Sequence, residues 1–287
     1  MTAGVAAMLL YAGQFVVSRW SLQATLSVWD LAMLRFTAAG VLLLPVVIRL
    51  GVASAAGIGW GRGLVLAITA GAPYTLVLYA GLAVAPASHG AVIIPGATPV
   101  VSTALVWLWF GERAGRARLA GLAAIVAGLV LVSWPGVTGG GGASTWAGDG
   151  LFAAASVLWG LYTVLARHWH VDPLRGTAVV WVVALVYSPI YVLLAGSRLL
   201  QAPPGEVLFQ AVYQGVGVAI LALLLYTWAI RVLGAAVASL LMPLIPVFGV
   251  LLAVPVLGEV PASLQVVGML AVSLGMALAA ARTREGG

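Results

Sequence analysis

Cysteine and lysine are both absent from this chain of 287 residues. The absence of cysteine excludes disulfides, thiolate zinc sites and catalysis by a thiol. Charge is scarce, because charged residues make up only 7% of the chain and a soluble domain is about three to four times richer. All thirteen basic residues are arginines, and they stand singly at the ends of apolar runs. This spacing argues against a nucleic-acid partner, and the missing charged skin excludes an ordinary soluble protein.

Hydrophobic residues take the place of charge. They make up 63% of the chain, and the mean hydropathy is +1.15. A bilayer crossing takes about 20 apolar residues. We therefore predict an all-α integral membrane protein with ten transmembrane helices, near residues 2–20, 28–50, 62–85, 87–110, 116–135, 146–167, 175–196, 208–231, 235–257 and 262–281. The first run has no basic leader and no cleavage signal, so we interpret it as a helix rather than a removed signal peptide.

The arginines also predict which way the helices run, because cytoplasmic loops carry an excess of them. If the N-terminus is cytoplasmic, only Arg19 and Arg198 face outward, and Arg35 lies within the second helix. The remaining arginines then lie on the cytoplasmic side: Arg49, Arg62, Arg113, Arg116, Arg118, Arg167, Arg175, Arg231, Arg282 and Arg284. We expect both termini in the cytoplasm.

The second half of the chain repeats residues of the first at an offset of 147. Tyr79, Pro99, Gly111, Glu112, Gly121, Ala124 and Gly128 recur as Tyr226, Pro246, Gly258, Glu259, Gly268, Ala271 and Gly275. A glycine run, Gly139–Gly142, separates the copies and predicts a flexible connection. Since five passes precede it, the second copy must be inverted relative to the first. We expect a first five-helix repeat at 1–135, an extracytoplasmic linker at 136–146 and an inverted five-helix repeat at 147–287.

The order of these residues resembles a known family. In the second copy, a Leu-Gly-Ala-Ala-Val-Ala-Ser segment from Leu233 leads through Pro243 and Pro246 to Gly258-Glu259, Gly268 and Gly275. The first copy matches through Arg35-Phe36, Pro99, Gly111-Glu112 and Gly121. Over essentially its whole length the chain resembles an EamA-type transporter of the drug/metabolite transporter superfamily, and within it the exporters of aromatic amino acids. The resemblance implies a central cavity lined by both halves, a bacterial inner (plasma) membrane, a small-molecule substrate and no cofactor. Two units fused in one chain also remove the need for a dimer.

Proline pairs lie in the fourth and ninth predicted helices. Pro95 and Pro99 occupy one, and Pro243 and Pro246 the other. Each proline removes a backbone donor and displaces the carbonyl four residues earlier, that of Ser239 among them. We expect both helices to be interrupted beside the substrate, with freed carbonyls available to a substrate ammonium. Simple packing kinks are the alternative.

A second candidate set combines aromatic rings with neutral polar groups. It comprises Tyr11, Gln14 and Ser18 in the first helix, Trp159, Tyr162 and Thr163 in the sixth, and Tyr79 and Tyr226 in the third and eighth. The first and sixth helices carry their groups at equivalent places, at helical spacing. Rings and hydroxyls without fixed charge suit a flat, amphiphilic solute. Interfacial anchoring is the alternative, and we prefer it for tryptophans at helix ends.

Titratable groups within the membrane are few. None of the seven acidic residues lies deep in a predicted helix, so coupling through a buried carboxylate is not expected. His89 is the one candidate proton acceptor within the membrane, although we prefer an interfacial role for it. Gln14 stands where the four-helix multidrug relatives carry a proton-binding glutamate, and an amide cannot titrate.

Three further charged residues need partners. Arg35 lies about two turns into its helix, where an unpaired charge is costly, so it should reach the interface, pair with Asp30 or meet a carboxylate or carbonyl from another helix. We prefer a structural role for it, with recognition of a substrate carboxylate as the alternative. Glu112 and Glu259 end helices, where the macrodipole disfavours them. Neighbouring arginines are available to Glu112, whereas the partner of Glu259 must be distant in sequence.

The leading hypothesis is an exporter or facilitator of small neutral or zwitterionic metabolites, most of all aromatic and other bulky amino acids, working by alternating access. Export of drugs, cations or other metabolites is the alternative. Phosphorylated solutes would need several deep cations, and only Arg35 is deep. An intramembrane enzyme would need clustered ligands or a nucleophile with its base, and the turn with His168, His170 and Asp172 suits at most a weak metal site. The repeated small residues after Gly121 and Gly268 predict close helix packing.

Overall fold

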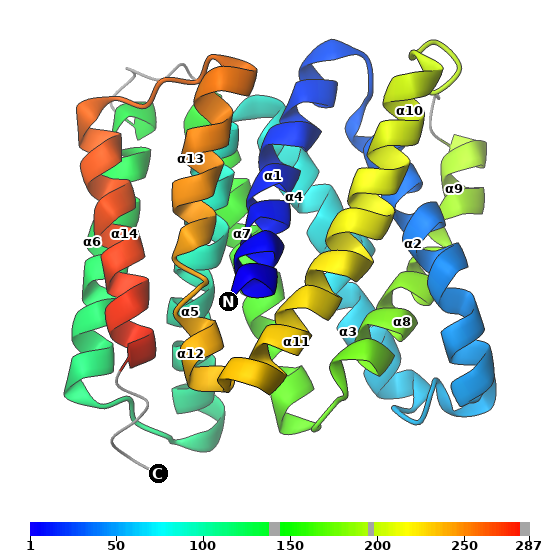
Figure 1. The fold of residues 1–287 in the computed structure, drawn as a ribbon, viewed down its shortest axis with the longest axis horizontal. Helices are drawn as coiled ribbons and strands as arrows, with labels where there is room; N and C mark the ends of the chain where they lie inside the picture. The colour runs from blue at the N-terminus through cyan, green and yellow to red at the C-terminus, as the bar shows by residue number, and fades with distance from the viewer. Residues whose placement is uncertain (138–143, 195–197, 282–287) are drawn as a thin grey trace.

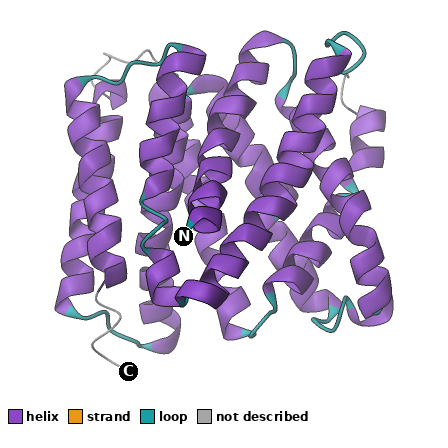
Figure 2. Ribbon diagram, in the orientation of Figure 1, coloured by secondary structure: helices purple, strands orange, loops and turns teal. Residues whose placement is uncertain are grey.

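The computed structural model describes residues 1–137, 144–194 and 198–281, and every regular element in these ranges is a helix (Figure 2). The first half contains α1 (Thr2–Ala24), α2 (Val28–Leu50), the short η1 (Val52–Ser54), α3 (Trp60–Ala70), α4 (Ala72–Val84), α5 (Ala87–Phe110) and α6 (Arg116–Val137). The second contains α7 (Thr145–His168), α8 (Pro173–Ala184), α9 (Tyr187–Leu194), α10 (Pro204–Gln210), the π-helix η2 (Ala211–Ala222), α11 (Leu223–Leu233), α12 (Ala235–Ser239), α13 (Leu244–Leu257) and α14 (Ser263–Ala281). The linker glycines Gly139–Gly142, Arg282 and Arg284 lie outside the described residues.

These elements form ten spans that are long and apolar enough to cross a membrane. Several spans are composite, because α3 with α4, α8 with α9, and α10 with η2 and α11 each make one crossing. Successive spans run in opposite directions in Figure 1, so α1 rises from the N-terminus whereas α7, which follows five crossings, descends. The predicted pair of inverted five-helix repeats is therefore confirmed.

The repeated Gly-Glu motif ends a span in each copy. Gly111 closes α5 with φ +70°, and Gly258 closes α13 with φ +68°. This left-handed conformation ends a helix without strain only in glycine. Glu112 and Glu259 consequently follow the fourth and ninth spans directly, at opposite ends of the bundle.

Proline acts differently in the two copies. The structure continues α5 as one α-helix through Pro95 and Pro99, so the span is not interrupted there, and the bend expected at these prolines stays a prediction. In the second copy a turn separates α12 from α13, and Pro243 is the N-cap residue of α13. Further breaks, at Gly71 between α3 and α4 and at residues 185–186 between α8 and α9, are not predicted by the sequence pattern.

The two closing helices of the repeats pack on each other at one edge of the bundle (Figure 1). Glycines let α6 and α14 approach closely, since a Cβ on Gly128 would lie 2.5 Å from the carbonyl oxygen of Gly268. Likewise, a Cβ on Gly121 would lie 2.8 Å from the carbonyl oxygen of Gly275. This is the close packing that the stripe of small residues predicts.

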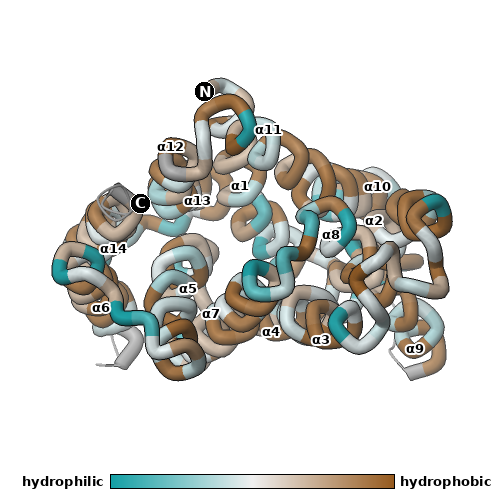
Figure 3. The backbone as a smooth tube through the Cα atoms, turned by 90° about the horizontal axis from the view of Figure 1, so that it is seen from below, coloured by the Kyte–Doolittle hydropathy of each residue, from teal (hydrophilic) through white to brown (hydrophobic). Residues whose placement is uncertain are grey.

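Many large hydrophobic residues are exposed on the outside of the bundle, and the backbone in Figure 3 is coloured hydrophobic along much of its length. Leu108 is 69% exposed and Leu193 is 81% exposed, which suits contact with lipid rather than water. We name the two ends of the bundle after an arginine at each. The Arg19 face is where α1 ends and α5 and α7 begin, at the top of Figure 1, and the Arg167 face is where α5 and α7 end and α12 begins.

Candidate functional site

The interior of the bundle holds a buried guanidinium. Arg35, on α2, is 5% exposed, and its Nη1 donates to Oε1 of Gln14 on α1 at 3.1 Å. Its other face covers the ring of Trp181 on α8, with Cζ 4.9 Å from the ring centre. Within the described ranges, Nε of Arg35 has no hydrogen-bond partner and no carboxylate forms an ion pair with it. The cation has thus found a partner on another helix, as one of the predicted outcomes has it, and that partner is neutral.

Asp30, the nearest acidic residue in sequence, does not neutralise Arg35. Its carboxylate accepts from the backbone nitrogen and the hydroxyl of Ser27, at 2.8 and 2.6 Å, and so caps α2. The hydroxyl of Tyr191 and the backbone nitrogen of Arg198 also donate to it. These donors occupy both oxygens of the carboxylate, and no carboxylate in the described ranges forms an ion pair with Arg35.

Aromatic rings from both repeats surround this centre. The ring of Trp159 lies 5.0 Å from that of Tyr74 and 5.0 Å from that of Tyr162, with tilts of 36° and 35°. Tyr11 lies within electrostatic range of Tyr74, Tyr162 and Tyr226. The structure therefore brings together candidate residues from α1, α7 and α11, and it adds Tyr74 from α4.

The other candidates are not among these ring contacts. Ser18 is fully buried and accepts a hydrogen bond from Nε2 of Gln214 at 2.8 Å, so it joins α1 to η2. Tyr79 is fully buried, and Thr163 is exposed and donates to a carbonyl of its own helix at 2.8 Å. Ser239 lies in α12, on the far side of the helix break.

Polar contacts seal the Arg19 face. Nε of Arg19 forms an ion pair with Oε1 of Glu259 at 2.6 Å, and its Nη1 donates to the carbonyl of Leu82 at 2.5 Å. The other carboxylate oxygen of Glu259 accepts from the backbone nitrogens of Ala87 and Ser88, at 2.8 and 3.4 Å. The distant partner predicted for Glu259 is thus Arg19. The pair ties α1 and the end of α13 to the connection between α4 and α5.

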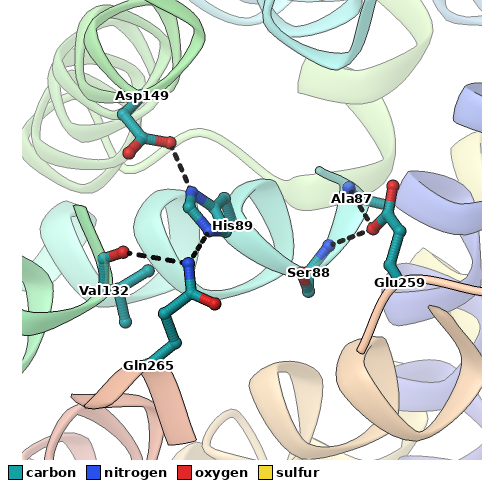
Figure 4. Close-up of polar contacts among 7 residues, drawn as sticks. All are labelled: Ala87, Ser88, His89, Val132, Asp149, Glu259 and Gln265. Atoms are coloured by element: carbon teal, nitrogen blue, oxygen red, sulfur yellow. Dashed lines mark hydrogen bonds and ion pairs between the residues drawn. The ribbon is translucent and has the colours of Figure 1, made fainter. Parts of the chain in front are cut away.

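His89 forms a second set of polar contacts between helices on the same face (Figure 4). We call this set and the Arg19–Glu259 pair the two locks of the Arg19 face. Its Nε2 lies 2.8 Å from the amide nitrogen of Gln265, a donor, so Nδ1 carries the ring proton and donates to Asp149 at 2.8 Å. The amide of Gln265 also reaches the carbonyl of Val132 at 3.5 Å. His89 is 1% exposed and joins α5, α7 and α14, so its role in this structure is to hold helices together beneath the surface.

The two faces differ in how tightly they are packed. Residues 87–94 of α5, at the Arg19 face, are all buried, whereas none of residues 97–110, toward the Arg167 face, is buried. α1 packs on α4 and α5, but no comparable packing joins α7 to α11, α12 or α13 in the described part of the chain. Tyr11, Trp159, Tyr162 and Tyr226 remain partly exposed in this loosely packed region. The aromatic centre is closed on the Arg19 side and less densely packed on the other.

The turn with His168, His170 and Asp172 does not form a metal site. No group of three His, Cys, Asp or Glu residues stands close enough to hold a metal anywhere in the described ranges. His170 and Asp172 instead line a cavity of about 240 Å³ at the Arg167 face, together with Arg62 and Arg175.

Sequence reasoning missed two members of the centre, Tyr74 and Trp181. Neither has a copy in the other repeat, and both reach Arg35 or Trp159 through packing between distant helices. The sequence feature that could have indicated them is Arg35, because a charge two turns inside a membrane helix requires neighbours that accommodate it.

Comparison with known proteins agrees with the duplicated fold. A model of the EamA-like transporter family matches residues 1–134 and 146–281. No curated protein matches the chain. Among solved structures, the chain is similar to one titled only "Crystal structure of protein", with a TM-score of 0.65, 20% identity, and coverage of 99% of this chain and 97% of the other. At that identity the likeness concerns the fold alone.

Proposed function

The chain belongs to the EamA-like transporter family, and we propose that its solute is a small zwitterion, most of all an aromatic or other bulky amino acid. The observation that carries this proposal is the buried guanidinium of Arg35, which has no acidic partner within the described ranges. A guanidinium binds a carboxylate through two parallel hydrogen bonds. Nε of Arg35 makes no hydrogen bond in the described ranges, so a carboxylate that reached it would find a free donor.

The rings beside Arg35 suit the rest of an aromatic amino acid. Tyr74, Trp159 and Tyr162 form a tilted series at 5.0 Å spacing, and another flat ring can pack against such a series. Aromatic faces also attract an ammonium group. Acidic groups near the centre would favour cations, but Asp30, the acid closest in sequence, is used by its own cap and by Tyr191. This distribution of charge supports a zwitterion over a cationic drug.

Alternating access is the mechanism that we propose. The supporting observation is the difference between the faces: ion pairs and buried helix close the Arg19 face, and α5 is loosely packed toward the Arg167 face. In inverted repeats, exchanging the conformations of the two halves reverses which face is closed. The excess of arginine at the Arg167 face supports its placement in the cytoplasm of a bacterium, with both termini inside. The present state would then receive substrate from the cytoplasm for export.

A binding measurement on purified protein tests the proposal. Phenylalanine is compared with phenethylamine, which lacks the carboxylate, and with 3-phenylpropionate, which lacks the ammonium. We expect phenylalanine to bind about 10- to 100-fold more tightly than phenethylamine, because hydrogen bonds to a charged group are each worth about 1.5–3 kcal/mol. Arg35→Gln should remove that preference. Equal affinity of the native protein for phenylalanine and phenethylamine, or no binding of any amino acid, would contradict the proposed substrate.

A further inference from the structure

The two residues of the Arg19–Glu259 ion pair are repeated in the sequence, and the repeated residues lie at the opposite end of the molecule, where they form no ion pair in the described ranges. Glu112 corresponds to Glu259 at the offset of 147. Arg167 corresponds to Arg19 at an offset of 148, the spacing that also relates Tyr11 to Trp159 and Gln14 to Tyr162. Glu112 follows α5 as Glu259 follows α13, and Arg167 lies in the last turn of α7 as Arg19 lies near the end of α1. Both members of the copy lie at the Arg167 face.

The copy is not engaged in this state. Glu112 and Arg167 are exposed, and neither forms an ion pair with any residue in the described ranges. The arginines that follow Glu112 do not neutralise it either, contrary to the sequence-based expectation. Yet their helices are already neighbours at this end, because the ring of Phe110 lies 4.9 Å from that of His168. Phe110 and His168, which stand close in sequence to Glu112 and Arg167, are therefore in contact, although Glu112 and Arg167 form no ion pair in the described ranges.

The docking surface is also duplicated. At the Arg19 face the pair binds the α4–α5 connection, through the carbonyl of Leu82 and the backbone nitrogens of Ala87 and Ser88. The equivalent connection joins α11 to α12, where Gly234 and Ala235 correspond to Ala87 and Ser88 at the offset of 147. Ala235 is exposed, whereas Ser88 is buried.

From this correspondence we propose that Glu112 and Arg167 are a second gate, which docks on the α11–α12 connection and closes the Arg167 face when the Arg19 gate opens. The inference rests on the alternating access proposed above, and it names the residues that carry it. The His89–Asp149–Gln265 lock has no such copy, because Ala236 and Arg118 stand at the places of His89 and Gln265. The Arg19 face therefore has one more lock than the other, which favours the state seen here.

Cross-linking tests the gate without any substrate. The chain has no cysteine, so introduced pairs react without background. We compare Glu112→Cys with Ala235→Cys, the proposed contact, against Glu259→Cys with Ser88→Cys, the equivalent contact that is observed. Arg113→Cys with Ala235→Cys is the matched control, because Arg113 is exposed beside Glu112 but has no place in the proposed gate.

The 112–235 pair should form a disulfide in higher yield than the 113–235 control. Adding Glu259→Gln should raise that yield about five-fold, the lower end of typical coupling between two states, because it unlocks the Arg19 face. Arg19→Gln removes the same lock from its other side and replaces Glu259→Gln if that variant does not fold. A 112–235 yield equal to the control, or one that neither variant raises, overturns the proposal. If the gate cross-links and no amino acid binds, the gate stands and the proposed substrate falls.

Discussion

Arg35 carries a charge in the interior of a membrane protein, and its neighbours only partly compensate that charge. Gln14 supplies one neutral acceptor and Trp181 one aromatic face. Desolvating an ion costs several kcal/mol, which a single amide and a ring offset incompletely. A membrane protein retains an expensive charge mainly where it has a function. A carboxylate arriving with the substrate would complete the coordination of Arg35.

A substitution of Gln14, which accepts a hydrogen bond from Arg35, tests whether Arg35 binds the substrate carboxylate. Gln14→Glu places a carboxylate 3.1 Å from the guanidinium, if the geometry is kept. The new ion pair competes with the substrate, so we expect phenylalanine to bind about 10-fold more weakly at neutral pH. Acidification that protonates the new carboxylate should restore binding, and the native protein should lack this pH response. Unchanged affinity and pH profile in titration calorimetry would show that Gln14 does not touch the solute.

At the scale of helices, the His89–Asp149 contact predicts strong coupling between α5 and α7. The two side chains are 1% and 7% exposed, so removing either one leaves a buried polar group without its partner. We expect His89→Ala and Asp149→Ala each to lower stability by about 3 kcal/mol. The double variant should be more stable than the sum of the two losses predicts, by about 1–3 kcal/mol. Thermal unfolding in detergent measures the cycle, with the exposed His168→Ala as control, and strict additivity would show that the contact is not formed.

The glycine contact between α6 and α14 supports a second prediction at this scale. A methyl group on Gly128 would lie 2.5 Å from the carbonyl oxygen of Gly268, and backbone cannot turn aside. Gly128→Ala should therefore lower the stability by about 1–3 kcal/mol, the usual cost of overpacking. Gly150→Ala is the matched control, because nothing lies within 4 Å of a Cβ at that helical position. An equal melting temperature for both variants would contradict the packing.

Sequence alone predicts the helices and their duplication well, because both depend on hydrophobicity and repetition along the chain. It fails at the breaks, since Pro95 and Pro99 are accommodated within α5 whereas the same span of the second repeat opens into a turn before Pro243. Whether proline interrupts a helix depends on its neighbours in space. The same limit applies to the site. Repetition marks Tyr226, but the contact between Arg35 and Trp181 joins helices that no pattern relates.

At the scale of the whole molecule, one sequence written twice occupies two different environments. The Arg19 face has both of its locks engaged, and the copy of one lock at the Arg167 face is exposed. Two halves with identical sequence and conformation would give two equivalent faces, so the asymmetry reflects both the present state and the His89 lock that only one face carries. The alternating access proposed above requires two such states, with one solute site accessible from each in turn.

Flux of labelled phenylalanine into liposomes that contain the purified protein is the most direct test of this account. The native protein should exchange phenylalanine well above protein-free vesicles, unlabelled tryptophan should compete, and phenethylamine should compete poorly. Arg35→Gln, at equal incorporation, should lose most of that exchange, about 10-fold or more if one charged hydrogen bond is lost. Flux of no amino acid above empty vesicles, or full flux in Arg35→Gln, would contradict a carboxylate site at the centre of the bundle.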